Sequence, residues 1–274
     1  MADLPETKAL ALSRDRSVLT VVLNRPEARN AMSLAMVREL ESVFAAIDDD
    51  RSIRTVVLRG AGHHFCAGGD VKDMASARMA EVTEALDPVF EVNRAFGRML
   101  ERVEASPQAL VAVCEGAVLG GGFGLACVAD VTLTTVDAEF GLPETSLGIP
   151  PAQIAPFLVK RIGHSQTRRL AVTGARFDGR EAVRVGVAHE CVDDVASLDA
   201  ALAVVLGKIA RCAPGAIATT KRIIAGVGQR PLDEVLDDGA RSFAESVRGP
   251  EGAEGTMAFV QKRAASWNDG EATR

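Results

Sequence analysis

The sequence has few of the side chains on which nucleic-acid and membrane proteins rely. Tyrosine is absent, tryptophan occurs once, and 37 acidic residues outnumber 31 basic ones, which gives a net charge of −6. Nucleic-acid binding depends on clustered Lys and Arg that neutralise phosphates, so this balance argues against a nucleic-acid partner. No apolar run approaches the ~20 residues that a membrane-spanning helix needs. The sequence therefore predicts no nucleic acid and no membrane as partners.

Cysteines are also few, and they do not form a disulfide pattern. The five of them are odd in number, widely spaced and set in apolar runs, as is typical of buried reduced thiols: Cys66, Cys114, Cys127, Cys191 and Cys212. The N-terminal segment lacks the basic start and apolar stretch of a signal peptide. We therefore predict a reducing, cytoplasmic location.

The residues that are present indicate an α/β protein. A chain of 274 residues, 47% of them hydrophobic and 25% charged, is long enough for one sizeable core. Short β-branched, apolar runs at Ser17–Leu23, Thr55–Arg59 and Leu110–Val113 predict buried strands. From Ser197 onward the pattern is helical throughout. Strands in the first two-thirds and helices in the last third predict an α/β core with a helical C-terminal region.

Two helices have clear start signals. Ser33 is placed to cap a helix whose apolar residues recur every three or four positions as far as Ile47. Asp87 followed by Pro88 is a second such start. The segment Val71–Leu86 lies between these helices and has poor periodicity, so we expect it to be a mobile cover.

Several common kinds of site lack a residue that they require. The phosphate-loop pattern fails at Ile209 and the dinucleotide-binding pattern fails at Leu125. No G-x-S-x-G nucleophile motif is present. His63 and His64 are adjacent rather than four residues apart, and Asp48–Asp50 is interpreted as a solvated turn. We therefore predict no metal and no redox cofactor.

Two glycine loops, each after a predicted strand, remain as a candidate site. FCAGGD runs from Phe65 and LGGGFG runs from Leu119. Consecutive glycines leave backbone N–H groups open to close approach, and a helix starting there adds unpaired donors. Two converging N–H groups form an oxyanion hole, and Glu144 follows as a carboxylate for proton transfer. The alternative is that both loops are tight turns and Glu144 is a surface acid.

The motifs resemble those of a known family. The strings NRPEARNAMS, FCAGGDVKDM, GAVLGGGFGLACVADV and FGLPETSLGI are similar, in order and spacing, to the four signature blocks of the crotonase (enoyl-CoA hydratase/isomerase) superfamily. EGTMAFVQKR, from Glu254, matches the closing helix of that superfamily. The resemblance implies a spiral of ββα turns with the acyl-CoA site in residues 1–196. It also implies that residues 197–274 assemble the chain into a homotrimer or a dimer of trimers (a hexamer).

The same resemblance implies roles for individual residues. Gly69 and Gly121 match the oxyanion-hole residues, whose N–H groups hold the thioester carbonyl of an acyl-CoA. Lys262 matches a residue that reaches a CoA phosphate from a neighbouring subunit, although a solvated helix-end lysine is an equal alternative. The positions that line the CoA site in the family are Ala28, Arg29, Ala67, Asp70, Val71 and Lys72. No separate cofactor is implied, because CoA is part of the substrate.

One position departs from the family pattern. Hydratases of the superfamily carry two glutamates that orient the attacking water, and this chain keeps one as Glu144 but has Gly124 at the other position. A single base suffices to shift a double bond, so hydratase and isomerase both stay open. Gln153 or another group is a candidate to hold the water. The absence of Asp and Glu from Thr145 to Val159 disfavours the dienoyl-shifting branch.

GGGFGLACVADV and LPETSLGIPPAQIAPFLVKRIG are similar to the isohexenylglutaconyl-CoA hydratase branch, which acts in acyclic terpenoid degradation on a branched enoyl-CoA with a second carboxylate. We therefore predict a lyase that hydrates a branched, glutaconyl-type 2-enoyl-CoA. Glu144 would transfer the protons with a pKa raised by burial, and the small Gly124 beside Phe123 would leave room for the branch. The alternatives are an enoyl-CoA isomerase and, in another class, a non-catalytic or RNA-associated binding protein of this fold.

Overall fold

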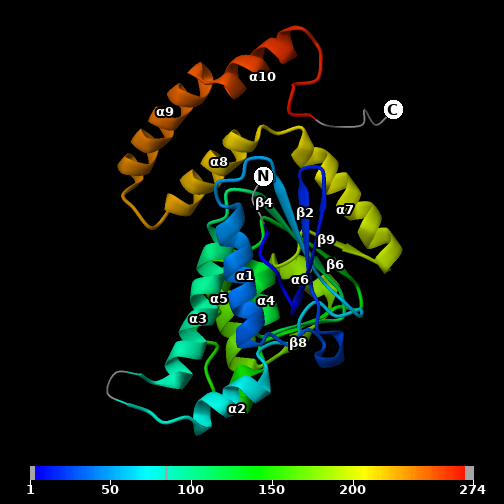
Figure 1. Ribbon diagram of the computed structural model, residues 1–274, viewed down its shortest axis with the longest axis vertical. Coiled ribbons are helices and arrows are strands. Elements are labelled where there is room, and N and C mark those ends of the chain that lie inside the picture. The colour runs from blue at the N-terminus through cyan, green and yellow to red at the C-terminus, as the bar shows by residue number, and fades with distance from the viewer. Residues whose placement is uncertain (1–3, 84–85, 269–274) are drawn as a thin grey trace.

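Six strands form the main sheet of the computed structural model, which describes residues 4–83 and 86–268. The first two strands pair antiparallel, and every later neighbour is parallel (Figure 1). In sheet order the strands are β1 (Leu10–Asp15), β2 (Val18–Leu23), β3 (Thr55–Gly60), β4 (Ala109–Cys114), β6 (Val131–Thr135) and β9 (Glu190–Val192). The predicted buried strands are confirmed as β2, β3 and β4, whereas β1 was not predicted.

The central strands β3 and β4 are buried on both faces, which explains their unbroken apolar character. All six residues of β4 are buried. Leu110 and Ala112 point into the main core, while Val111 and Val113 pack on the other face beside Leu198. Successive side chains of a strand point to opposite faces, so a strand covered on both sides is apolar throughout.

A small second sheet supports the glycine-rich stretch. It contains β5 (Ala117–Leu119), β7 (Glu139–Gly141) and β8 (Arg176–Phe177), in that order. Phe123 packs edge-on against Phe140 and Phe177, with ring centroids 5.9 Å and 5.8 Å away. The sequence pattern did not predict these strands, because two or three residues are too few to show a period.

The predicted helix caps are confirmed. Ser33 Oγ accepts a hydrogen bond of 3.2 Å from Met36 N–H at the start of α1 (Leu34–Ile47). Asp87 accepts the Val89 N–H at 2.9 Å at the start of α3 (Pro88–Glu104). The segment expected to be a mobile cover begins as a helix, α2 (Val71–Met79). Its positions 84–85 lie outside the described residues, and its mobility stays a prediction.

The remaining helices follow the glycine-rich stretch and account for most of the last third of the chain. They are α4 (Gly121–Cys127), α5 (Ala155–Thr173), α6 (Gly179–Val185), α7 (Val195–Ala210), α8 (Pro214–Gly226), α9 (Leu232–Arg248) and α10 (Pro250–Val260), with 3-10 turns η1 (Pro26–Ala28) and η2 (Glu144–Leu147). The helical prediction from Ser197 onward is confirmed as far as Val260, whereas residues 261–268 form no helix and positions 269–274 lie outside the described residues. Within the described ranges no single helix is long and apolar enough to cross a membrane, and α7 with α8 passes that test only as a pair bent by 98°.

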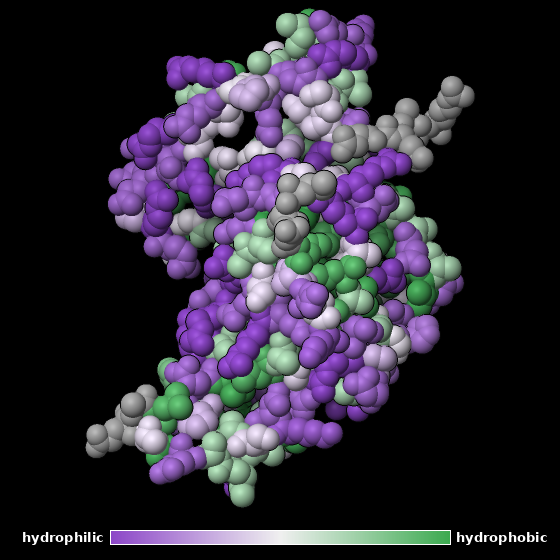
Figure 2. All heavy atoms as spheres, in the orientation of Figure 1, coloured by the Kyte–Doolittle hydropathy of each residue, from purple (hydrophilic) through white to green (hydrophobic). Residues whose placement is uncertain are grey.

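The C-terminal helices differ in how they contact the body. Leu198 and Ala201 of α7 pack against the sheet. In contrast, α9 and α10 extend to the end of the molecule opposite α2, and the space-filling view shows a gap between them and the body (Figures 1 and 2). A division into a core of residues 1–196 and an assembly region of residues 197–274 stays a prediction, and α7 packs as part of the core.

Candidate active site

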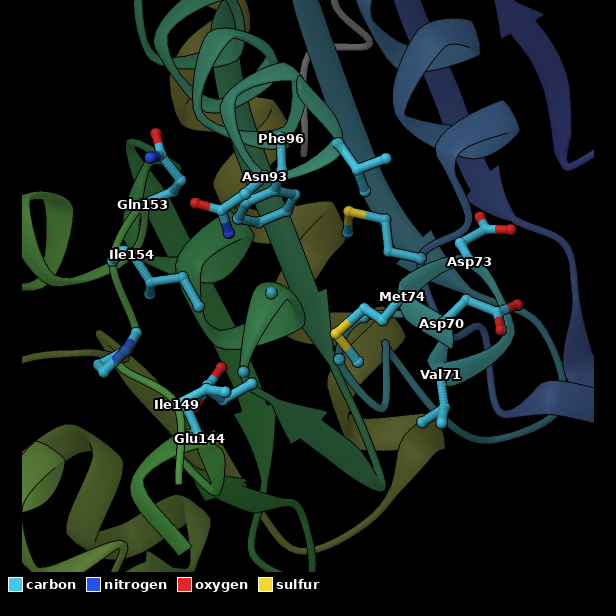
Figure 3. A pocket seen from close by; sticks show the side chains of 18 of the residues that line it. Asp70, Val71, Asp73, Met74, Asn93, Phe96, Glu144, Ile149, Gln153 and Ile154 are labelled. Carbon is cyan, nitrogen blue, oxygen red and sulfur yellow. The ribbon is translucent and has the colours of Figure 1, made fainter. Parts of the chain in front are cut away.

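A cavity of about 230 Å³ lies between the two glycine loops, α2, α3 and the segment that follows β7. Ala67, Gly69 and Asp70 of the first loop line it. Gly120 and Gly121 of the second loop line it as well. Glu144 and the segment 147–154 complete its wall, and Figure 3 shows these side chains around the common space. The fold therefore brings together the two loops and the glutamate that the sequence singled out.

The second glycine loop is shaped by close backbone contacts. Gly120 has a φ of 49°, in the left-handed region that favours glycine, and it precedes the first turn of α4. A Cβ on Gly122 would lie only 2.5 Å from the carbonyl oxygen of Cys66. That same carbonyl accepts the Leu119 N–H at 2.9 Å, and Cys66 N–H donates to Ala117 O at 2.8 Å. Cys66 thus ties the first glycine loop to β5 and to the second loop.

Two backbone N–H groups at this junction donate to no residue that the structure describes. Met32 bonds to both neighbours of Gly69, donating to Gly68 O at 2.7 Å and accepting from Asp70 N–H at 3.0 Å. The Gly69 N–H is therefore directed away from Met32. Gly121 is the first residue of α4, where an N–H has no intrahelical acceptor. Both donors belong to residues that line the cavity.

Glu144 carries a carboxylate with an unused oxygen. Its Oε1 lies 2.6 Å from the point where a Cβ on Gly120 would lie, so the carboxylate rests against the second loop. Its Oε2 is buried and has no hydrogen-bond partner among the described residues. Burial raises the pKa of this carboxyl above its ordinary 4.5, although a hydrogen bond from its own backbone N–H partly opposes the rise. An unpartnered carboxylate of this kind is suited to proton transfer.

A family comparison decides the class of protein. The model of the enoyl-CoA hydratase/isomerase family matches residues 13–270. The chain belongs to this family. The resemblance to the crotonase superfamily and the predicted α/β fold are both confirmed, and an enzyme acting on an acyl-CoA is the function that the family implies.

Relatives and solved structures agree with the family. The chain is 33% identical over 267 residues to the carnitinyl-CoA dehydratase of Proteus mirabilis (strain HI4320), covering 95% of this chain and 98% of the relative. It is 30% identical over 255 residues to the 2,3-dehydroadipyl-CoA hydratase of Escherichia coli (strain K12), covering 93% and 96%. The structure of Pseudomonas aeruginosa AtuE matches with a TM-score of 0.93 at 58% identity, over 96% of this chain and all (100%) of that one. The Marinobacter aquaeolei enoyl-CoA hydratase/isomerase matches with a TM-score of 0.93 at 50% identity, covering 95% and 99%.

Apolar groups surround Gly124, the position at which the resemblance implies a second glutamate in hydratases. Gly124 is buried, and a Cβ there would lie 3.1 Å from Ile154 Cγ2 and 3.4 Å from Leu100 Cδ1. Gly124 is not among the residues that line the cavity. The expectation that Gly124 leaves room for an acyl branch is therefore wrong, because Ile154 and Leu100 occupy the adjoining space.

Two further carboxylates line the cavity on the α2 side, and both are engaged. Asp70 pairs with Arg25 at 2.8 Å and accepts the Lys72 N–H at 2.9 Å. Burial opposes the ionisation of Asp70, but these two partners outweigh it and lower its pKa. Asp73 Oδ2 accepts the Leu34 N–H at 2.6 Å, which joins α2 to the start of α1. These carboxylates hold the wall of the cavity in place.

The residues that the resemblance assigned to CoA fall into three groups. Ala67, Asp70 and Val71 line the cavity. Ala28 and Arg29 are not among the residues that line it, although Arg29 O accepts the N–H of the lining residue Ala67 at 3.0 Å. Lys72 does not line it either and is exposed on α2. Within one chain Lys262 is not brought to the cavity, because it follows α10 at the end opposite α2 (Figure 1).

The contribution of α3 to the cavity was not predicted from the sequence. Asn93 and Phe96 line the cavity, and the ring of Phe96 lies 3.2 Å from the point where a Cβ on Gly121 would lie. The two residues are three apart on a helix and therefore share a face. Asn93 is exposed on α3 and belongs to no motif, so the sequence offered no signal for it.

Proposed function

We propose that this enzyme adds water across the double bond of a branched 2-enoyl-CoA. The observation that carries the proposal is the unpartnered carboxylate of Glu144 in the same cavity as the free N–H groups of Gly69 and Gly121. Hydration needs a base for water and a site for the negative charge on the thioester oxygen. These three residues supply both.

In the proposed reaction the thioester carbonyl oxygen accepts hydrogen bonds from Gly69 and Gly121. Glu144 takes a proton from water as the water oxygen bonds to Cβ, and the π electrons move through Cα onto the thioester oxygen. The enolate collapses when Glu144 returns the proton to Cα. Each oxyanion donor is worth roughly 2.7–4 kcal/mol of barrier. The raised pKa of the buried Glu144 carboxyl suits it to act first as base and then as acid.

The substrate proposal rests on the cavity and on the motifs. The wall of the cavity is mainly apolar, with Leu34, Val37 and Phe96 among its residues, and such a wall suits a hydrocarbon acyl group. The lining that the structure describes contains no Lys or Arg, so a second carboxylate of a glutaconyl-type substrate would pair with a cation from outside this lining. The similarity of LPETSLGIPPAQIAPFLVKRIG to the isohexenylglutaconyl-CoA branch supports a branched acyl group of that type, with a role in terpenoid degradation.

Assembly into a homotrimer or a dimer of trimers is also proposed. Four large apolar side chains are exposed on α9, by 55–73% of their area: Leu232, Leu236, Phe243 and Val247. A helix with such a face is stable when a partner covers it, and a neighbouring chain would also allow Lys262 to reach a CoA phosphate. Light scattering of the purified chain should give three or six chain masses. A monomeric mass would contradict this assembly.

Replacement of Glu144 by Gln tests the proposed chemistry. We expect the hydration rate to fall by roughly 10²–10⁴-fold, because Gln cannot exchange the proton. The matched control is Glu190→Gln, which removes an exposed carboxylate on β9 away from the cavity. The measurement is kcat with a branched 2-enoyl-CoA, with folding checked by circular dichroism. Full activity in a folded Glu144→Gln variant would overturn the proposal.

An enoyl-CoA isomerase is the second candidate, and the observation that favours it is Gly124. A single carboxylate suffices to move a proton between Cα and Cγ, and the other glutamate position holds no carboxylate. Separate incubations with 2-enoyl and 3-enoyl thioesters distinguish the reactions. A 3-hydroxyacyl product indicates hydration, whereas interconversion of the two alkenes without it indicates isomerisation.

A further inference from the structure

Hydration by a single carboxylate leaves one requirement unmet. The attacking water needs a second polar contact that fixes its direction toward Cβ, and proximity of this kind contributes strongly to rate. The usual place for that contact is closed here, because Gly124 faces Ile154 and Leu100. The inference below rests on the proposed hydratase function and concerns the group that holds the water.

The cavity lining offers few polar side chains for this task. Besides Glu144, those with polar atoms are Asp70, Asp73, Asn93 and Gln153. Asp70 is occupied by Arg25 and the Lys72 N–H, and Asp73 is occupied by the Leu34 N–H. Releasing either carboxylate would leave a structural donor unpaired, which is costly. The choice is therefore between the two amides.

The side-chain amide of Gln153 packs against Gly97 of α3. Its Oε1 lies 1.9 Å from the point where a Cβ on Gly97 would lie, so the amide fills the space above Gly97 on α3. Figure 3 shows this amide turned away from Glu144. Gly97 is buried, and a side chain there would displace the amide. Gln153 therefore closes the wall of the cavity rather than facing its interior.

Asn93 is exposed, and it lines the cavity together with Glu144. It lies one turn before Phe96 on α3, and the Phe96 ring is 3.2 Å from the Cβ position of Gly121. In Figure 3 the Asn93 amide and the Glu144 carboxylate lie on opposite sides of the cavity. The Asn93 side chain makes no hydrogen bond to another residue in the described part of the chain. Its amide is thus free to bind a water between the two side chains.

We propose that the side-chain amide of Asn93 holds the attacking water opposite Glu144. Asn93 is a positioning residue in this role, since a neutral amide donates and accepts hydrogen bonds but takes no proton at ordinary pH. Glu144 alone accepts the water proton and returns it to Cα. The pH profile of kcat should therefore rise through one carboxyl pKa, that of Glu144, with no contribution from a second carboxylate.

Two reactions of the same site separate water positioning from the rest of the chemistry. Hydration of a 2-enoyl-CoA needs the oxyanion donors, Glu144 and an oriented water. Exchange of the α-proton of a saturated acyl-CoA for deuterium needs only the donors and Glu144. Asn93→Ala should lower kcat for hydration by about 10- to 100-fold, while the exchange rate changes by less than about 3-fold.

Matched variants complete the test. Gln153→Ala should leave the ratio of hydration to exchange unchanged, and Asn93→Asp should add a second carboxyl pKa to the pH profile. The proposal is overturned if Asn93→Ala keeps full hydration, if it lowers hydration and exchange equally, or if Gln153→Ala gives the selective loss instead. Failure of the hydratase proposal is separate, because the parent protein would then form no 3-hydroxyacyl product, or a folded Glu144→Gln variant would keep full hydration.

Discussion

The two glycine loops differ in how tightly the protein encloses them, although Gly69 and Gly121 line the same cavity. A Cβ on Gly69, in the first loop, would meet only Met74 Cε, at 4.0 Å. In the second loop a Cβ on Gly120 would lie 2.6 Å from Glu144 Oε1, and one on Gly122 would lie 2.5 Å from Cys66 O. The first loop therefore borders open space, whereas the second loop packs closely against Glu144 and against Cys66 of the first loop.

The largest effect is expected from a methyl group in the closed loop. Gly122→Ala would press a Cβ against the Cys66 carbonyl, a backbone atom that cannot turn away. We expect a loss of at least about 2–3 kcal/mol in the free energy of unfolding. Hydration activity should fall with it, because the second loop carries the Gly121 donor. Denaturant unfolding followed by circular dichroism measures the loss.

The open loop provides the control for this variant. Gly69→Ala adds the same methyl group where nothing lies closer than 4.0 Å, and Gly69 does not have the positive φ that disfavours alanine. Its free energy of unfolding should stay within about 1 kcal/mol of the parent protein. Equal losses in the two variants would refute the distinction between an open and a closed loop.

A smaller effect is expected from the carboxylate that rests on the closed loop. Burial raises the pKa of Glu144 above 4.5, so between 4.5 and the raised value the folded state binds more proton than the unfolded state. The contribution of Glu144 to the free energy of unfolding therefore falls as pH rises through this interval. Glu144→Gln should be more stable than the parent near pH 7, and the difference should shrink as pH falls through this interval toward 4.5.

Thermal unfolding of both proteins across this pH range measures that difference. Glu190→Gln is again the control, because it removes an exposed carboxylate on β9 away from the cavity. A stability difference for Glu144→Gln that did not change with pH would show that the Glu144 carboxyl is not perturbed by burial. Such a result would weaken the case for Glu144 as the base.

Local signals were sufficient for much of the fold. Ser33 and Asp87 were identified as helix caps because their preference depends on the next few N–H groups only. β3 and β4 were identified because strands covered on both faces are apolar throughout. The strands β5, β7 and β8 escaped prediction, since each gains its partner from a distant part of the chain.

Sequence motifs likewise identified only part of the candidate site. Gly69, Gly121 and Glu144 were found by motif, and the fold places all three around one cavity. Asn93 carries no motif, and its position depends on how α3 packs beside the second loop. The expectation that Gly124 leaves room for an acyl branch was wrong because Ile154, which follows η2 in the chain, packs beside Gly124 in the fold.

The sequence by itself determined the family, and it singled out the two glycine loops and Glu144, because each of these depends on short motifs in a fixed order. The tertiary structure alone decided which acids are free. Asp70 and Asp73 have partners from Arg25 and Leu34, whereas Glu144 is left with an unpaired buried oxygen. The physical reason is that a carboxyl group's pKa and availability depend on neighbours that only the folded chain supplies.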